Sequence, residues 1–343
     1  MTFDDGLLDD EVALARADVR LRTLAESGSR VRREAVAASD ALAESVERLG
    51  EMRPRAVVAA GPDSRLLRAV LEPVCPVPFV AWPAPGLPAW AGSLDLVVVL
   101  APEGHDQATA GAVAEAVRRG CQLLVATPSR SLVGEHALGR YTTMIPTQTG
   151  DQLAIAVVVL DLLDRLDLGP RTDPEVVADA LDEVAVGCSP HRDLATNPAK
   201  LLASGIADCN PLLWGGTVLA ARAARRIAES IRRATGRTAL AADAEHLMPI
   251  LEQTLPADVF ADPFADEGVQ RRPALIVLDD HDHDDARDAA AVETRMRLGA
   301  AARAAGVREE LITSQASDDV ARYAAMLSTG TYAAAYLQVG LDA

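Results

Sequence analysis

The chain has 343 residues, of which 49% are hydrophobic and only 3% aromatic, and its formal net charge is −17 at pH 7. This length predicts about two domains of the usual ~100–200 residues. An acidic chain with few aromatic side chains lacks the cationic surface and the stacking platform that bind nucleic acid, so we expect no nucleic-acid partner.

The first residues, MTFDDGLLDD, are acidic and do not contain the apolar core of a signal peptide. The longest apolar run, at 153–163, is too short to cross a bilayer. The four cysteines fit neither a CxxC pair nor a zinc pattern, which predicts buried or half-buried free thiols in a reducing compartment. We therefore expect a cytoplasmic protein that does not associate with membranes and needs no cofactor.

The first half of the chain alternates apolar runs with amphipathic segments. Residues 8–49 carry apolar side chains at three-to-four spacing, which predicts one or two helices that pack onto the first domain. Beyond them, continuous apolar runs such as LDLVVVLAP are typical of central strands in a parallel sheet. The predicted strands are 54–62, 77–82, 94–102 and 121–128, and the predicted helices are 63–72, 106–119 and 150–166.

Several prolines, among them Pro170, Pro174 and Pro190, punctuate the middle of the chain and predict a domain boundary there. We expect an N-terminal domain over 1–167, a linker over 168–190 and a C-terminal domain over 191–343.

The second half repeats the alternation of strands and helices. The predicted fold class is therefore α/β, with two tandem three-layer αβα domains whose parallel strands are joined by right-handed crossovers. Residues 196–216 begin this half with an Asn-Pro turn, a helix and an apolar strand that ends in Gly215-Gly216, an arrangement that presents backbone N–H groups to an anion. The predicted strands are 210–216, 236–243, 273–280 and 309–314, and the predicted later helices are 217–234, 285–305 and 316–339.

Ligands of open parallel sheets bind outside the carboxyl ends of the strands, and two loops of the first half carry small or hydroxyl residues there. The loop AAGPDSRLL offers Gly61 and Ser64, as a phosphate-binding turn or as an ordinary helix start. The loop LAPEGHDQAT offers Gly104 for a tight turn and Thr109 near the helix start.

Two carboxylates share that second loop. Asp106 can cap the following helix, and both Glu103 and Asp106 would repel a phosphate at the same place. A third loop, ATPSRSLVG, contains Thr127, Ser129 and Arg130, of which Arg130 is the best-placed cation of the first domain. The hydroxyl-rich segment 142–152 could contact a sugar, and the alternative for both segments is a polar loop with helix caps.

His246 lies near Asp243 and Glu245 in the sequence, and a histidine among carboxylates can act as a general acid or base near neutral pH. A histidine on a helix surface is an equal alternative. The run DDHDHDD, at 279–285, resembles a metal site, but adjacent ligands cannot all converge on one ion, so we favour a solvated loop. Lys200, the only lysine, could contact a ligand or another domain.

The order of elements and two local stretches resemble the sugar isomerase (SIS) family, closest to its archaeal-type bifunctional phosphoglucose/phosphomannose isomerases. NPAKLLA at 197–203, followed by NPLLWGG, is similar to the family's NPAK turn, helix and strand, and 327–343 is similar to its late helix. The resemblance implies two SIS-type, flavodoxin-like domains, a homodimer and a sugar-phosphate ligand. It assigns ligand binding to Gly61, Ser64, Gly104 and Thr109, and ring opening to His246.

Two departures from the family pattern bear on activity. Serines of the family's phosphate loop are replaced by Ala101 and Glu103, and the glutamate that serves as isomerase base falls near Arg232. An arginine cannot be that base at neutral pH, because its pKa lies above ~12. Two interpretations stay open. One is a divergent phosphoglucose/phosphomannose isomerase-like protein that binds a sugar phosphate. The other is a catalytically inactive protein that senses a sugar phosphate or binds a partner.

Overall fold

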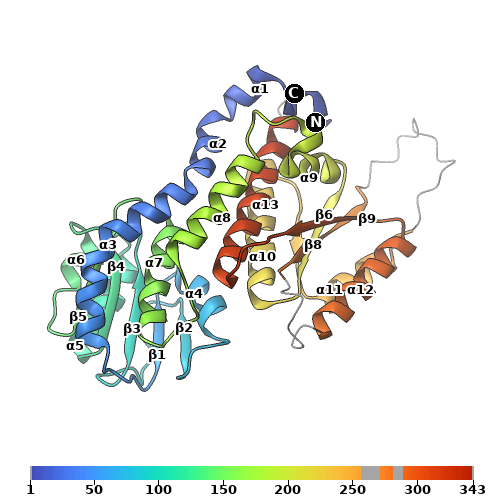
Figure 1. Cartoon of the computed structure of the whole chain (residues 1–343). Coiled ribbons are helices and arrows are strands. Elements are labelled where there is room, and N and C mark those ends of the chain that lie inside the picture. The colour runs from blue at the N-terminus through green and yellow to red at the C-terminus, as the bar shows by residue number, and fades with distance from the viewer. Residues whose placement is uncertain (1, 256–270, 281–288, 342–343) are drawn as a thin grey trace. The chain divides into compact units, whose positions relative to one another are not determined.

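The computed structural model describes residues 2–255, 271–280 and 289–341 of the chain (Figure 1). The chain divides into two compact units, one of Ser27–Asp179 and one of Met1–Glu26 with Ala180–Ala343. Among the helices in the described ranges, none is both long and apolar enough to cross a membrane.

The unit of Ser27–Asp179 contains a five-stranded sheet in the order β2-β1-β3-β4-β5, with every neighbouring pair parallel. Four of its strands lie inside the predicted ranges, so the α/β class with a parallel sheet is confirmed. The strands are β1 (Val57–Ala60), β2 (Phe79–Trp82), β3 (Leu96–Leu100), β4 (Gln122–Thr127) and β5 (Thr142–Pro146).

Strand β5 was not among the predicted strands, since the sequence analysis interpreted 142–152 as a sugar-contacting segment or as a polar loop. Its side chains alternate between half-buried and buried, with Thr143 and Ile145 on the inner face. Threonine is polar but β-branched, and β-branched residues suit a half-buried strand at the edge of a sheet. The strand was therefore missed because its threonines were interpreted as polar residues of a loop.

Helices cover both faces of this sheet. On one face, small and branched side chains of α5 pack against β1, β3 and β4. On the other, α7 is buried on nearly all sides, as expected for a helix without a polar face, and it packs against α3. The helices are α3 (Ser27–Leu49), α4 (Ser64–Leu71), α5 (Gln107–Arg119), α6 (Leu132–His136) and α7 (Gln152–Arg165).

Helix α8 (Pro174–Gly187) occupies most of the segment in which the sequence predicted a linker, and the border between the two units falls within it. Pro174 is the first residue of α8, where the missing N–H of proline leaves no intrahelical bond unmade. A proline that indicated a break thus begins a helix.

The second unit contains a four-stranded parallel sheet in the order β7-β6-β8-β9. Its strands are β6 (Asn210–Gly215), β7 (Leu240–Ala241), β8 (Pro273–Asp279) and β9 (Arg308–Thr313). Its helices are α1 (Glu11–Arg16), α2 (Asp18–Ala25), α9 (Pro198–Ile206), α10 (Val218–Thr235), α11 (Ala244–Glu252), α12 (Ala289–Ala304) and α13 (Asp319–Leu341), preceded by the 3₁₀ turn η1 (Asp5–Leu8).

The first 26 residues belong to this second unit, whereas the sequence predicted that helices within 8–49 pack onto the first domain. Only α3 does so. The N-terminal residues are held by long-range bonds: the Asp4 amide donates to the Gly340 carbonyl at 2.9 Å, and Arg20 donates to Gln338 Oε1 at 2.6 Å. These pairings are too distant in sequence to be predicted from periodicity.

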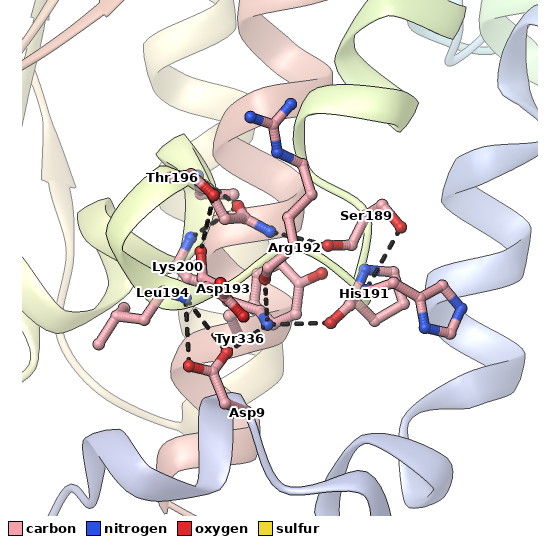
Figure 2. A network of polar contacts seen from close by, with 12 residues as sticks. Asp9, Ser189, His191, Arg192, Asp193, Leu194, Thr196, Lys200 and Tyr336 are labelled. Atoms are coloured by element: carbon pink, nitrogen blue, oxygen red, sulfur yellow. Dashed lines mark hydrogen bonds and ion pairs between the residues drawn. The ribbon is translucent and has the colours of Figure 1, made fainter.

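A buried lysine supplies the third attachment (Figure 2). Lys200 is fully buried in α9, and its Nζ donates to Asp9 Oδ1 at 2.8 Å and to the carbonyls of Pro190 and Arg192 at 3.0 and 2.8 Å. The ammonium also lies 5.5 Å from the ring centroid of Tyr336. All three of its N–H donors are therefore bonded, and Asp9 is its counter-ion, as a buried charge requires.

The cysteines are free thiols, as predicted. Cys121 and Cys188 are buried, whereas Cys75 and Cys209 are half-buried. Burial raises the pKa of Cys188 to about 12, so its thiol stays protonated and unreactive at neutral pH.

Candidate functional site

The best candidate for a ligand site is the carboxyl edge of the five-stranded sheet. From β1 the chain proceeds through α4 to β2 on one side, and from β3 through α5 to β4 on the other. Open parallel sheets bind ligands at such a reversal of strand order. The segments at the carboxyl ends of β1, β3 and β4 contain seven of the eight residues that the sequence analysis singled out for binding or catalysis, and the structure allows each to be placed.

Four of those residues form two close pairs, Gly61 with Thr109 and Gly104 with Thr127. Gly61 has φ +90°, and a Cβ on it would lie 3.4 Å from Thr109 Oγ1. Gly104 has φ +70°, and a Cβ on it would lie 2.9 Å from Thr127 Oγ1 and 2.5 Å from Ser131 Cβ. Both glycines therefore adopt a conformation that L side chains avoid, and Gly104 also has no room for a methyl group.

Asp106 is the N-cap of α5, as the sequence predicted. Its Oδ2 accepts the Thr109 N–H at 2.7 Å and the Thr109 hydroxyl at 2.5 Å. These bonds hold the pKa of Asp106 below its ordinary value, the side-chain bond from Thr109 being the largest cause. The carboxylate is thus ionised at neutral pH and takes up donor groups at the start of this helix.

The third predicted loop is divided between buried and exposed groups. Thr127 is fully buried, and its Oγ1 lies 3.0 Å from Ser131 Oγ. Since Ser131 Oγ already donates to the Pro128 carbonyl, Thr127 is the donor in this pair. Ser129 and Arg130 are exposed, and Arg130 forms no ion pair with any described residue.

Three buried polar atoms at the carboxyl edge have no hydrogen-bond partner among the described residues. They are Ser64 Oγ, Thr147 Oγ1 and Trp82 Nε1, which lie at or just after the ends of β1, β5 and β2. Ser64 is only 1% exposed and Thr147 7%. A buried hydroxyl without a partner costs about 1–3 kcal/mol, so such groups normally meet water or a ligand.

Of these three residues, the sequence analysis identified Ser64 alone. Thr147 lies in the segment whose hydroxyls it noted as a group, and nothing in the sequence distinguished Trp82 from an ordinary core residue.

A carboxylate from outside the predicted loops also reaches this edge. Glu34 of α3 is 1% exposed, and it accepts the Gln148 amide at 3.0 Å and the Thr149 amide and hydroxyl at 2.5 and 2.6 Å. The sequence analysis did not identify it. The available signal was a glutamate on the apolar face of an amphipathic helix, between the buried Val31 and Ala38.

The corresponding edge of the second sheet also combines a helix start with a carboxylate. Thr217 caps α10 by accepting the Ala220 amide at 3.1 Å, and its hydroxyl donates to Asp280, which follows β8. A Cβ on Gly215 would clash with the backbone of Ala220, so glycine allows α10 to begin close to β6. The predicted anion-binding turn is thus bordered by a carboxylate.

The remaining sequence candidates lie in the second unit. His246 is exposed near the start of α11, the surface position that was one of its two interpretations. Arg232, at the expected place of the isomerase base, donates to the Ala239 carbonyl at 2.7 Å. Lys200 is fully bonded inside the unit, which leaves it no free donor for a ligand.

The metal prediction concerns the run 279–285, of which residues 281–285 lie outside the described ranges. Asp279 forms an ion pair with Arg295. Within the described part of the chain, no group of three or more histidine, cysteine or carboxylate side chains is placed to hold a metal ion.

No protein-family model matches this chain, and no curated protein matches it. Among solved structures, tagatose-6-phosphate ketose/aldose isomerase from Escherichia coli is similar over 92% of this chain and 91% of its own, with a TM-score of 0.64 and 13% identity. The C-terminal domain of glucosamine-fructose-6-phosphate aminotransferase from Francisella tularensis is similar over 93% and 95%, with a TM-score of 0.61 and 11% identity.

At such low identities these likenesses show the fold and not the activity. The fold is that of phosphosugar isomerases, two tandem SIS-type αβα domains in one chain, as the sequence predicted. The narrower resemblance to the archaeal-type bifunctional isomerases stays a prediction.

Proposed function

We propose that this chain is a sugar-binding protein built on the phosphosugar isomerase fold, and that it senses its ligand rather than isomerising it. The ligand class is a sugar phosphate or the parent sugar. The observation that carries the proposal is the pair of buried hydroxyls of Ser64 and Thr147 at the carboxyl edge of the five-stranded sheet, neither of which has a hydrogen-bond partner among the described residues. Sugar hydroxyls both donate and accept, so a bound sugar can satisfy such groups.

The chemistry of the second unit supports a role without turnover. Aldose–ketose isomerisation needs a base that moves a proton between two carbons and a group that opens the ring. The expected base position holds Arg232, whose guanidinium is bonded to a carbonyl, and Lys200 is occupied by three acceptors. An arginine is protonated at neutral pH and is no base, and Lys200 has all three of its N–H donors bonded, so neither group supplies the base.

A glucose-6-phosphate/mannose-6-phosphate isomerase of the same fold is the second candidate. It is favoured by the arrangement of Gly61, Thr109, Gly104 and Thr127, which preserves adjoining loops at the place where such folds bind ligands. In this candidate His246 opens the ring. A coupled assay with glucose 6-phosphate and mannose 6-phosphate separates the two. Turnover that disappears in His246→Ala supports the isomerase, and ligand binding without turnover supports the sensor.

Ser64→Ala tests the location of the ligand. We expect the affinity for fructose or fructose 6-phosphate, whichever binds the wild type, to fall about 3–10-fold, because one hydrogen bond is lost. The stability of the free protein should not fall, since this hydroxyl has no partner to lose. Isothermal titration calorimetry and thermal unfolding measure the two quantities.

Ser45→Ala is the matched control. Ser45 is equally buried in the same unit, but its hydroxyl donates to the Ala41 carbonyl within α3. The control should leave the affinity unchanged. An unchanged affinity in Ser64→Ala as well would place the ligand elsewhere.

We also propose, from the sequence, that the protein is a cytoplasmic homodimer. Light scattering of the purified protein tests the dimer. A monomeric mass at every concentration would exclude it.

A further inference from the structure

We infer that the carboxyl-edge site selects the unphosphorylated form of its sugar, because the Asp106 carboxylate occupies the position that a ligand phosphate would need. This inference rests on the proposed sugar-binding function and makes it more specific. Asp106 is then a specificity-determining residue, which rejects sugar phosphates and admits neutral hexoses.

The first step of the argument concerns the start of α5. A helix N-terminus at the reversal of strand order offers backbone N–H groups to an anion. Here the amide and hydroxyl of Thr109 are already bonded within the chain, since Asp106 Oδ2 accepts both. A phosphate would have to displace a carboxylate that is tethered three residues away. Its own negative charge would then be repelled by that carboxylate.

The second step concerns the loop that precedes α7, where carboxylates of the protein again accept backbone amides. Glu34 accepts the amides of Gln148 and Thr149, and Asp151 accepts the amides of Leu153 and Ala154 at 2.9 and 3.2 Å. Side chains of the protein therefore take up amide donors of both loops. At each of these two places a carboxylate of the protein thus competes with a bound anion for backbone amides.

The third step concerns charge. Asp151 is paired with Arg30 at 2.6 Å, so this arginine is neutralised. Glu103 adds an exposed carboxylate beside the start of α5, 3.2 Å from the exposed His105. The exposed Arg65 and Arg130 stand against the carboxylates of Glu34, Glu103 and Asp106, so acids outnumber arginines here and the local field disfavours a dianionic phosphate.

The groups that need a partner at this edge are neutral. Ser64 Oγ and Thr147 Oγ1 are buried and unbonded among the described residues. A hydroxyl pairs equally well with the hydroxyls of a sugar ring, as donor or acceptor, and needs no charge on the ligand. The chemistry of the site thus fits a hexose without its phosphate.

Calorimetric titration of the full chain with fructose, fructose 6-phosphate, glucose and glucose 6-phosphate tests the inference. We expect the wild type to bind a free hexose at least about ten-fold more tightly than its 6-phosphate, since like charges at one site cost affinity. Asp106→Asn keeps the shape of the cap and removes the charge. It should bring the two affinities within about three-fold, chiefly by strengthening the phosphate ester.

Asp10→Asn is the matched control, because Asp10 caps α1 in the other unit by the same bond, from the Ala13 amide at 2.8 Å. It should leave the ratio of affinities unchanged. Asp106→Ser, which also caps helices, is a second variant in case the amide perturbs folding.

The outcomes separate this inference from the proposal beneath it. Tighter binding of the 6-phosphate by the wild type, or a ratio that Asp106→Asn does not change, overturns the inference and leaves sugar binding intact. Binding of neither the hexose nor its phosphate overturns sugar binding itself, and the inference with it.

Discussion

Lys200 is a buried charge that connects segments of one unit that are far apart in the sequence. Its ammonium joins the N-terminal residues, through Asp9, to the turn that contains Pro190 and Arg192. Asp9 also accepts the Leu194 amide, and the hydrogen bond from Lys200 is the largest cause of its lowered pKa. The single lysine of the chain is therefore explained by structure, not by catalysis.

Asp9→Asn should lower the free energy of unfolding by about 1–2 kcal/mol, because it leaves a buried ammonium without a counter-ion. A fully buried pair would cost more, but the Asp9 side chain is 46% exposed and water screens it. Chemical denaturation of the two proteins measures the difference.

The pH dependence of that difference follows from the sign of the shift. An aspartate whose pKa is lowered in the folded state stabilises it above the unfolded pKa of about 3.9, and the stabilisation is lost as the pH falls through the folded value. The difference in unfolding free energy between wild type and Asp9→Asn should be constant from about pH 8 to 5 and shrink below about pH 4.

The control Asp18→Asn removes an exposed pair with Arg22 and should change stability by less than about 0.5 kcal/mol. An equal effect of both variants would contradict the assigned role of Lys200.

Glu34→Ala tests a second residue that the sequence did not reveal. It leaves two amides and a hydroxyl of Gln148 and Thr149 without their acceptor, and we expect a loss of about 2–4 kcal/mol in unfolding free energy. Glu34→Gln should cost less, since its amide oxygen still accepts. The exposed Glu44 of the same helix provides the comparison, and Glu44→Ala should be nearly neutral. Equal losses at the two positions would show that Glu34 does not hold the loop.

At the scale of elements, the turn between β3 and α5 depends on Gly104. Gly104 and Gly150 both have positive φ, at +70° and +66°, but only Gly104 is crowded, by Ser131 and Thr127. Alanine at either position should cost about 1 kcal/mol in backbone strain. Gly104→Ala should cost a further ~1–3 kcal/mol from the clash. Equilibrium unfolding of both variants measures the excess, and equal losses would mean that the turn tolerates a methyl group.

The sequence predicted the elements whose signal is local. Continuous apolar runs located β1, β3, β4, β6 and β8, and the parallel α/β class followed from their alternation with helices. It missed α6, whose five residues are too few to show a period, and α8, whose first-turn proline suggested a break. It also assigned α1 and α2 to the wrong neighbours, because the bonds that hold the N-terminal residues connect positions about as distant as the chain allows.

The candidate site was predictable to a similar extent. The loops were located by their glycines and hydroxyls, and Asp106 was identified as a cap. Glu34 was not, because it reaches Gln148 across 114 positions of sequence. The unpartnered state of Ser64 and Thr147 depends on tertiary packing and has no signature in the sequence.

At the scale of the whole molecule, the two units repeat one plan. The orders β2-β1-β3-β4-β5 and β7-β6-β8-β9 correspond strand for strand, apart from the additional β5. Such a repeat is expected of a duplicated fold. The carboxylates at the two sheet edges meet helices that do not correspond: Asp106 caps α5, which follows β3, whereas Asp280 accepts from Thr217 at the start of α10, which follows β6, the counterpart of β1.

The central claim is that the molecule binds a sugar and does not convert it. Proton NMR of the full chain, mixed with fructose and separately with fructose 6-phosphate, reports binding and conversion in one experiment. Binding broadens the signals of the sugar, whereas isomerisation produces new anomeric signals. The account predicts that the protein broadens the signals of fructose, and that Ser64→Ala reduces this broadening. It also predicts that no aldose forms over a day. Formation of glucose or mannose 6-phosphate from fructose 6-phosphate at an enzymatic rate would contradict it.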